Sequence, residues 1–366
     1  MELENLDSDA CTAVHDLAAR SCVQADTVGG ALFRLSGTET GLRALAAGLA
    51  QIPSASHVSA EILGVIEAFS ASAFSLDFPG GRLDLGRTPL IMGVLNVTPD
   101  SFSDGGAFFR KEEAVDRALE MIEQGADIVD VGGESTRPDA EPVSVEEELT
   151  RVVPVIAQIA ERSHVPVSID TYKSKVADEA LNVGAKIVND ISALRFDAEM
   201  ASVVAEHAVP VILMHILGTP RDMQHNPAYL DVVAEIVAYL RSALAHAVAE
   251  GISWDRTVID PGIGFGKTVS HNLQIIGRLS EFKSLGRPIL IGTSRKSFIG
   301  KVLGLEVGER VFGTAATVAA SVLAGAHIVR VHDVAEMKQV ARMAGVLRAP
   351  EQMRQATPDG VGAAES

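Results

Sequence analysis

The chain has few cysteines: only Cys11 and Cys22 occur in its 366 residues. Neither lies near a third cysteine or a histidine at the spacing that a zinc site requires, so a structural zinc site is excluded. Two thiols also provide no disulfide framework of the kind that stabilises small secreted domains. The simplest interpretation is a pair of free thiols in a reducing cytoplasm.

Basic residues are scarce as well. The chain has 31 Lys and Arg against 48 Asp and Glu, which gives a formal net charge of −17. Nucleic acids and anionic lipids require a basic surface, so broad affinity for either is excluded, and any anionic ligand must meet a local basic pocket. The acidic residues 1–9 do not resemble a secretory signal, and the most apolar run, 314–329, is short for a bilayer span. We expect a cytoplasmic protein that does not bind membranes.

Short apolar runs rich in Val and Ile alternate with stretches of helical period from Pro89 onward. Runs that are apolar almost throughout are typical of parallel strands covered on both faces. Eight such units predict an α/β fold, a (β/α)8 TIM barrel; the alternative, an open doubly wound sheet, fits the even spacing less well. The expected strands are 90–96, 127–132, 166–170, 186–189, 210–214, 257–260, 288–292 and 327–332.

The two ends of the chain differ from this pattern. Residues 1–85 are rich in Ala and Ser, with helical stretches at 40–51 and 59–71 and a turn at 79–81. We expect them to form a small, mainly helical N-terminal extension, to which no role is assigned. The barrel is expected at 86–349. The polar tail at 350–366 is expected to be disordered.

Polar residues follow the predicted strands where a barrel gathers them into one rim. Asp170 and Asp260 end two apolar strands, so both carboxylates should be partly desolvated and need donors. Each is either a structural polar plug or an acceptor for a ligand edge with paired N–H groups. Two such acids beside Asn189 favour a nitrogen heterocycle that is rich in donors.

Basic residues gather after the last two strands. Lys296 follows the seventh strand, while Arg330 and His332 stand two apart at the end of the eighth and should point the same way. Loops at these positions form the recurring phosphate site of the barrel, so the three residues predict an anion clamp. Solvated surface charges are the alternative, which the apolar neighbours of Arg330 disfavour.

Three further loop residues admit two interpretations each. Arg137 can grip an oxyanion with parallel hydrogen bonds, or it can be a surface residue paired with Glu134 or Asp139. Asn96 can be a Mg²⁺ ligand, although a turn-forming role is favoured from its position alone. The 260–268 segment fails as a phosphate-binding loop because Pro261 replaces its first glycine, so exposure of Phe265 for stacking is favoured.

Seven segments in order along the chain together resemble dihydropteroate synthases, a family of pterin-binding barrels. They are 90–106, 130–138, 168–173, 189–191, 260–267, 292–297 and 330–333. The resemblance implies a sulfonamide target, an Mg²⁺-assisted transferase of folate biosynthesis that joins a dihydropterin diphosphate to p-aminobenzoate after the bond to diphosphate has broken. We also expect a homodimer, because the apolar helix of small residues predicted at 313–326 can pack closely against a partner, as the late helices of the family do. One departure is Leu217, where many members carry Gln.

The resemblance also implies a role for each matching residue. The residues implied in catalysis are Lys296, Arg330, His332, Asp170 and Asp260. Those implied to bind the pterin diphosphate are Thr136, Asp170, Asn189, Met214, Asp260, Lys296, Arg330 and His332. Those implied near p-aminobenzoate are Thr136, Arg137, Pro138, Phe265 and Ser297, and Asn96 is the implied Mg²⁺ ligand.

Two other functions compete with this one. A methyltetrahydrofolate corrinoid methyltransferase would share the pterin-facing Asp and Asn residues but would need no anion clamp, so Lys296, Arg330 and His332 argue against it. A non-catalytic partner subunit that kept the fold is the second alternative, and the retained basic residues argue against it too.

Overall fold

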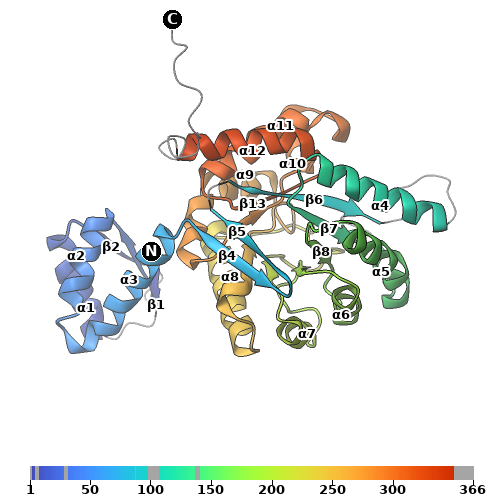
Figure 1. Cartoon of the computed structure of the whole chain (residues 1–366). Coiled ribbons are helices and arrows are strands. Elements are labelled where there is room, and N and C mark those ends of the chain that lie inside the picture. Colours follow the sequence, from blue (N-terminus) through green and yellow to red (C-terminus); the bar gives the residue numbers. More distant parts are fainter. Residues whose placement is uncertain are drawn as a thin grey trace, which may run out of the picture. The chain divides into compact units, whose positions relative to one another are not determined.

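The computed structural model describes residues 2–4, 8–28, 32–86, 88–97, 107–136 and 141–349. Within the chain two compact units are distinguished, each described by itself below. The first comprises Met1–Ala71 with Glu281–Gly286, and the second comprises Ser72–Ser280 with Arg287–Ser366. Figure 1 shows the second unit as a ring of helices around a parallel sheet.

Eight parallel strands form the sheet of the second unit, in the order β11-β10-β9-β8-β7-β6-β13-β12. The first and last strands along the chain are neighbours, with Leu90 opposite Ile328, and a bridge between Ile259 and Ile289 joins the two ends of the order. The predicted barrel is therefore confirmed, and the open sheet is excluded. The strands are β6 Leu90–Asn96, β7 Ile128–Gly132, β8 Val167–Asp170, β9 Ile187–Asp190, β10 Val211–Met214, β11 Thr257–Asp260, β12 Leu290–Ile291 and β13 Ile328–Val331.

Helices cover the outside of this sheet. They are α4 Ala107–Glu123, α5 Val145–Arg162, α6 Ser174–Asn182, α7 Met200–His207, α8 Val232–Ala249, α9 Val269–Gly277, α10 Ser297–Leu303, α11 Val311–Leu323 and α12 Val334–Arg348, with 3₁₀ turns at Trp254–Arg256 and Val307–Glu309. A further 3₁₀ turn, Leu279–Leu285, falls mostly in the first unit. One of the described helices, α8, is long and apolar enough to cross a membrane. It is a barrel helix whose Val233, Ile236 and Leu240 are buried.

A β-hairpin belongs with the barrel unit. Its strands β4 (Phe74–Phe78) and β5 (Gly81–Leu85) are antiparallel, and Leu76 and Leu85 are almost fully buried. They pack against the first inward-facing layer of the barrel, made by Met92, Ile128, Ile187, Ile212, Val258, Leu290 and Ile328. The sequence suggests that the barrel part begins at residue 86, whereas the compact barrel unit begins at Ser72. The earlier start arises because the hairpin covers apolar side chains of the barrel interior.

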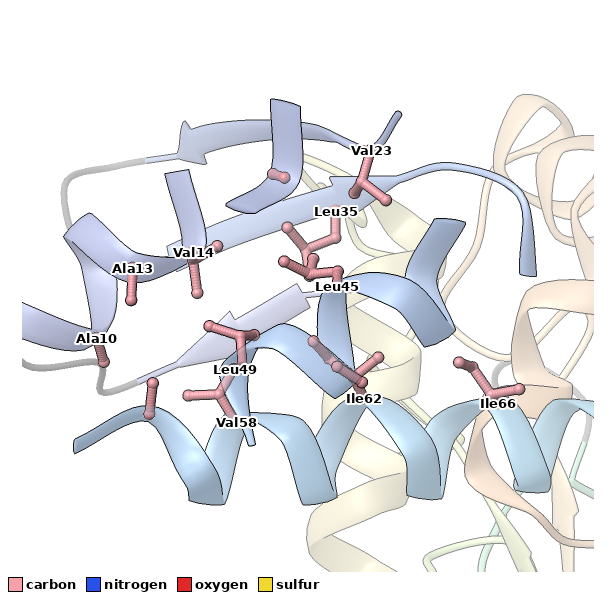
Figure 2. Close-up of a cluster of buried hydrophobic side chains, with 13 residues drawn as sticks. Ala10, Ala13, Val14, Val23, Leu35, Leu45, Leu49, Val58, Ile62 and Ile66 are labelled. Carbon is pink, nitrogen blue, oxygen red and sulfur yellow. The ribbon is translucent and has the colours of Figure 1, made fainter. Parts of the chain in front are cut away.

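The N-terminal unit has a core of its own. Its helices α1 (Ser8–Arg20), α2 (Glu39–Leu49) and α3 (Ser56–Ser70) pack with the antiparallel strands β1 (Glu2–Glu4), β3 (Leu32–Ser36) and β2 (Gln24–Val28), and a 3₁₀ turn spans Pro53–Ala55. Figure 2 shows Val14, Leu35, Leu45, Leu49 and Ile62 pointing into this core. The extension is mainly helical as expected, and it also contains a small sheet that the sequence analysis did not predict.

Candidate active site

The alternation of side chains along each strand selects the residues that point into the barrel. Ile128 belongs to the inward-facing layer beside the hairpin, so Asp130 and Gly132 share its side of β7. On the other strands, too, every second residue after the apolar layer points inward, and the last of these residues are mostly polar and lie at the opposite mouth of the barrel. The inward positions reached in this way include Asn96, Asn189, Met214, Asp260, Arg330 and His332. Asp170, at the end of β8, also points inward, since it pairs with Arg330.

The register of the strands brings several of these residues to one level. Asn96 lies opposite Gly132, Gly132 opposite Asp170, and Asp170 opposite Asn189, which forms a continuous row across β6 to β9. Met214 lies opposite Asp260 on the next pair of strands. The mouth of the barrel therefore gathers the amide and carboxylate groups that the sequence placed at separate strand ends.

Arg330 lies between two carboxylates inside the barrel. Its Nε donates to Asp130 Oδ2 at 2.6 Å, and one terminal nitrogen donates to Asp170 Oδ2, also at 2.6 Å. Asn189 Nδ2 donates to the same oxygen of Asp130 at 3.1 Å. Burial raises the pKa of Asp170 to about 7, although Arg330 opposes this rise. Burial disfavours the charge of Arg330, but the two carboxylates outweigh it and raise the pKa of the guanidinium.

Lys296 and Asp260 form the second charged part of the mouth. Asp260 is buried, and its Oδ1 accepts a hydrogen bond from the Gly262 amide at 2.7 Å. Lys296 donates to the Ile263 carbonyl, and its Nζ lies 4.3 Å from the centre of the Phe265 ring. Burial lowers the pKa of Lys296 to about 8 against the attraction of Asp260. The ammonium therefore keeps most of its charge at neutral pH and loses it as the pH rises through about 8.

His332 is one of the three residues predicted to form an anion clamp, and its ring is neutral at neutral pH. Its backbone N–H donates to Ser294 Oγ at 3.2 Å, and its Nδ1 lies 3.0 Å from the same oxygen. Burial and the nearby Arg330 lower the pKa of His332 to about 4. The clamp expected from three basic residues therefore carries its positive charge on Lys296 and Arg330, and the imidazole contributes hydrogen bonding.

The 260–268 loop is held by a buried lysine. Lys267 Nζ lies 2.9 Å from His215 Nδ1 and donates to the Phe265 carbonyl at 2.8 Å. Burial lowers the pKa of Lys267 well below its usual value. Its amine is thus used inside the protein, which agrees with the rejection of a phosphate-binding loop. Gly262 has a positive φ, and a Cβ there would lie 1.9 Å from the His215 carbonyl oxygen, so only glycine fits.

The residues expected near p-aminobenzoate are only partly described. Thr136 is half-buried after β7, and Ser297 is exposed at the start of α10. Phe265 packs against an apolar cluster that contains Met214. The other two, Arg137 and Pro138, lie outside the described residues.

Several buried charged residues were not assigned from the sequence. Asp130 is fully buried in the middle of β7 and pairs with Arg330. Its inward alternation with Ile128 was the available signal, although Val129 and Val131 hide that alternation. Glu148 and Lys173 are joined by a buried ion pair, which no local pattern in the sequence reveals.

Comparison with known proteins places this site in a family. The family model described as "Pterin binding enzyme" matches residues 92–332. A dihydropteroate synthase of Bacillus subtilis is 50% identical over 260 residues, which cover 71% of this chain and 88% of that protein. One of Escherichia coli K12 is 48% identical over 264 residues, which cover 72% and 93%. The chain belongs to the dihydropteroate synthases.

Solved structures agree with this membership. A Yersinia pestis dihydropteroate synthase in complex with a sulfonamide drug has a TM-score of 0.71 and 40% identity, and the match covers 77% of this chain and all of that one. The Xanthomonas albilineans synthase with 4-aminobenzoic acid has a TM-score of 0.70 and 42% identity, with coverage of 78% and 100%. Both the fold and the enzyme class expected from the sequence are confirmed.

Proposed function

We propose that the mouth of the barrel condenses 6-hydroxymethyl-7,8-dihydropterin diphosphate with p-aminobenzoate, which gives 7,8-dihydropteroate and diphosphate. The observation that carries this proposal is the gathering of acceptors and donors at one mouth of the barrel. Asp170 and Asn189 lie in register there, and Asp260 lies opposite Met214, one inward step further along the strands. The carboxylates accept hydrogen bonds from ring N–H groups, while Met214 provides an apolar wall.

Arg330 and His332 are proposed to face the diphosphate. The two ion pairs of Arg330 use two of its five N–H donors, so three remain for an oxyanion while Asp130 and Asp170 hold the guanidinium in place. His332 adds a hydrogen bond from a neutral ring, and Lys296 adds a second positive charge. The competing methyltransferase function would not require this concentration of cations.

Asn96 is proposed as the protein ligand of Mg²⁺. It lies half-buried at the end of β6, in register with the row of polar residues. Among the described residues no cluster of three His, Cys, Asp or Glu side chains could hold a metal ion. An amide oxygen nevertheless fits Mg²⁺, which commonly takes one or two protein ligands and completes its shell with water and substrate phosphates. The ion would neutralise charge on the leaving diphosphate.

The proposed reaction is dissociative. The C–O bond to diphosphate breaks first, and the arylamine then attacks the cationic pterin methylene. Asp170 and Asp260 hold the ring and stabilise its positive charge, while Lys296 and Arg330 stabilise the departing anion. Thr136, Phe265 and Ser297, together with Arg137 and Pro138, are proposed to receive p-aminobenzoate. No covalent nucleophile is required.

We also propose a cytoplasmic homodimer that binds neither nucleic acid nor membranes. The net charge of −17 disfavours binding to nucleic acid and to anionic membranes. Exposed apolar side chains on α11 and α12 support the dimer, since large apolar surfaces mark interaction sites. They are Phe312, Leu323, Met343 and Leu347, of which Phe312 is 85% exposed.

Replacement of Asp260 by Asn tests the pterin site. The change puts a donor where ring N–H groups need an acceptor, and a buried polar mismatch lowers affinity on the order of 10- to 100-fold. Calorimetry with the dihydropterin alcohol and a turnover assay with Mg²⁺ and p-aminobenzoate measure the effect. Asp84→Asn on the exposed hairpin strand is the control. Wild-type affinity in a folded Asp260→Asn variant would remove Asp260 from the site.

A further inference from the structure

Lys173, just after β8, joins three oxygen atoms that come from two other parts of the barrel unit. Its Nζ donates to Glu134, to Glu148 Oε2 at 2.5 Å and to the Val143 carbonyl at 2.6 Å. Glu134 follows β7, and Val143 precedes α5, to which Glu148 belongs. A single ammonium group therefore binds both ends of the connection between β7 and α5.

The two ends of this connection are also bonded to each other. The Val143 N–H donates to Glu134 Oε2 at 3.3 Å, and Arg151 on α5 donates to the Gly133 carbonyl at 2.7 Å. The half-buried Thr136 lies two residues beyond Glu134. The position of Thr136 relative to the barrel mouth thus depends on groups that Lys173 holds together.

Because the cluster is buried, loss of one of its charges costs more than the loss of a charge from a surface ion pair. The side chains of Lys173, Glu134 and Glu148 are 13%, 9% and 1% exposed. Burial raises the pKa of Glu148, while for Lys173 the two carboxylates outweigh burial and raise the pKa of the ammonium. Loss of the lysine would leave two buried acids without their shared cation. An ordinary exposed pair would add little.

Tyr172 connects the cluster to the wall of the proposed pterin pocket. Its hydroxyl donates to Glu134 Oε1 at 2.7 Å, so both oxygens of that carboxylate are occupied by neighbouring residues of one segment. Its ring packs in the apolar cluster that contains Met214 and Phe265.

We propose that Lys173 is a positioning residue that sets the affinity for p-aminobenzoate by fixing the short segment after β7 that carries Glu134 and Thr136. This inference rests on the proposed function, in which Thr136 lies beside p-aminobenzoate and not at the pterin diphosphate, the second contact that the resemblance implies for it. Lys173 itself contacts the flanks of the connection and acts through them. A purely structural role would lower stability without separating the two substrates, whereas a positioning role affects p-aminobenzoate alone.

The test compares steady-state kinetics of Lys173→Met with those of Lys338→Met. Lys338 is a suitable control because it makes one partly exposed ion pair with Asp127, before β7. In Lys173→Met the KM for p-aminobenzoate should rise at least about tenfold, because buried charged hydrogen bonds are lost. The dissociation constant of the dihydropterin diphosphate, measured by calorimetry, should stay within about twofold. Lys173→Arg, which keeps the charge, should recover part of the affinity.

Two further variants keep the outcome decisive. Tyr172→Phe removes one hydrogen bond to Glu134 and should raise the same KM by about three- to tenfold even if Lys173→Met does not fold. Equal weakening of both substrates, or a lowered melting temperature with unchanged KM in folded Lys173→Met, overturns the proposal. Thr136→Ala distinguishes failure of the proposed role of Lys173 from failure of the proposed function of Thr136. An unchanged KM for p-aminobenzoate in that variant refutes the placement of Thr136, on which the proposal rests.

Discussion

Arg330 binds two carboxylates that lie 160 and 200 positions away in the sequence. The pairing gives this residue a structural task beside the proposed contact with diphosphate. Strand alternation predicted that Arg330 points inward, but its partners depend on how distant strands come together. A charge at this position could therefore be recognised from the sequence, while the ion pairs that hold it required the three-dimensional structure.

Arg330→Met should destabilise the fold. It leaves Asp130 and Asp170 buried without their cation, a change that costs roughly 3–5 kcal/mol of unfolding free energy. Asp170 already has a pKa of about 7, and loss of the guanidinium raises it further. The folded variant then binds a proton that the unfolded chain releases, so its stability falls as the pH rises from about 4 to above 7. Urea unfolding at several pH values measures this slope, with Arg330→Lys as the control. A variant as stable as the wild type at pH 8 contradicts the pairing.

Lys296 should produce an alkaline limit to anion binding. Its pKa of about 8 means that the ammonium loses its charge as the pH rises through 8. Affinity for inorganic diphosphate should therefore decline above that pH in the wild type. Arg keeps its charge far beyond this range, so Lys296→Arg should shift the decline upward. Calorimetry with diphosphate and Mg²⁺ from pH 6.5 to 9.5 checks both proteins; identical profiles would assign the titration to another group.

Elements of secondary structure were predictable where apolar runs are clearly bounded. The predicted strands 90–96 and 257–260 coincide with β6 and β11. β12 is shorter than predicted because Pro288 lacks an N–H for the ladder and only Leu290 and Ile291 pair regularly. The polar strand β2 has no apolar run, so its pairing with β3 could not be anticipated.

The β4–β5 hairpin should decide how far the chain can be shortened. A truncated chain that begins at Gly86 lacks Leu76 and Leu85, so the apolar layer that they cover becomes exposed. It should aggregate or melt at much lower temperature, since each fully buried Leu contributes roughly 1.5–3 kcal/mol.

A truncated chain that begins at Ser72 keeps the hairpin and should remain folded and active. Size-exclusion chromatography and thermal melting compare the two truncations, with the complete chain as the reference. Equal stability of the two shortened proteins would show that the hairpin does not support the barrel.

At the scale of the whole molecule, association should depend on the exposed surface of α11 and α12. Phe312→Asp combined with Met343→Asp places charges on that surface and should shift a dimer toward monomer at micromolar concentration. Val248→Asp, at an exposed apolar position on α8, is the control and should leave association unchanged. Sedimentation velocity distinguishes the species. A wild-type protein that is monomeric at these concentrations would refute the homodimer.

The N-terminal unit extends beyond the part shared with the shorter relatives. A probable bifunctional folylpolyglutamate synthase/dihydropteroate synthase of Haloferax volcanii is 41% identical over 326 residues, which cover 86% of this chain and 38% of that protein. This coverage exceeds what residues 72–366 can supply, so the alignment includes part of the N-terminal unit. The similarity in this region assigns no role to it. A composition rich in Ala and Ser was the signal that predicted a separate part, and the core around Leu45 and Leu49 belongs to that part alone.

The pairing of β6 with β13 has a consequence during synthesis of the chain. Leu90 leaves the ribosome long before its partner Ile328, and at about 5–20 residues per second the interval is on the order of 10–50 s. Throughout that time one edge of β6 has no strand beside it, and exposed edges invite aggregation. The hairpin, which is made first, is already available to cover the apolar end of β6 through Leu76 and Leu85. The nascent chain therefore carries a cover for the apolar side chains at one end of its earliest barrel strand before the barrel can close, while the backbone edge of that strand waits for β13.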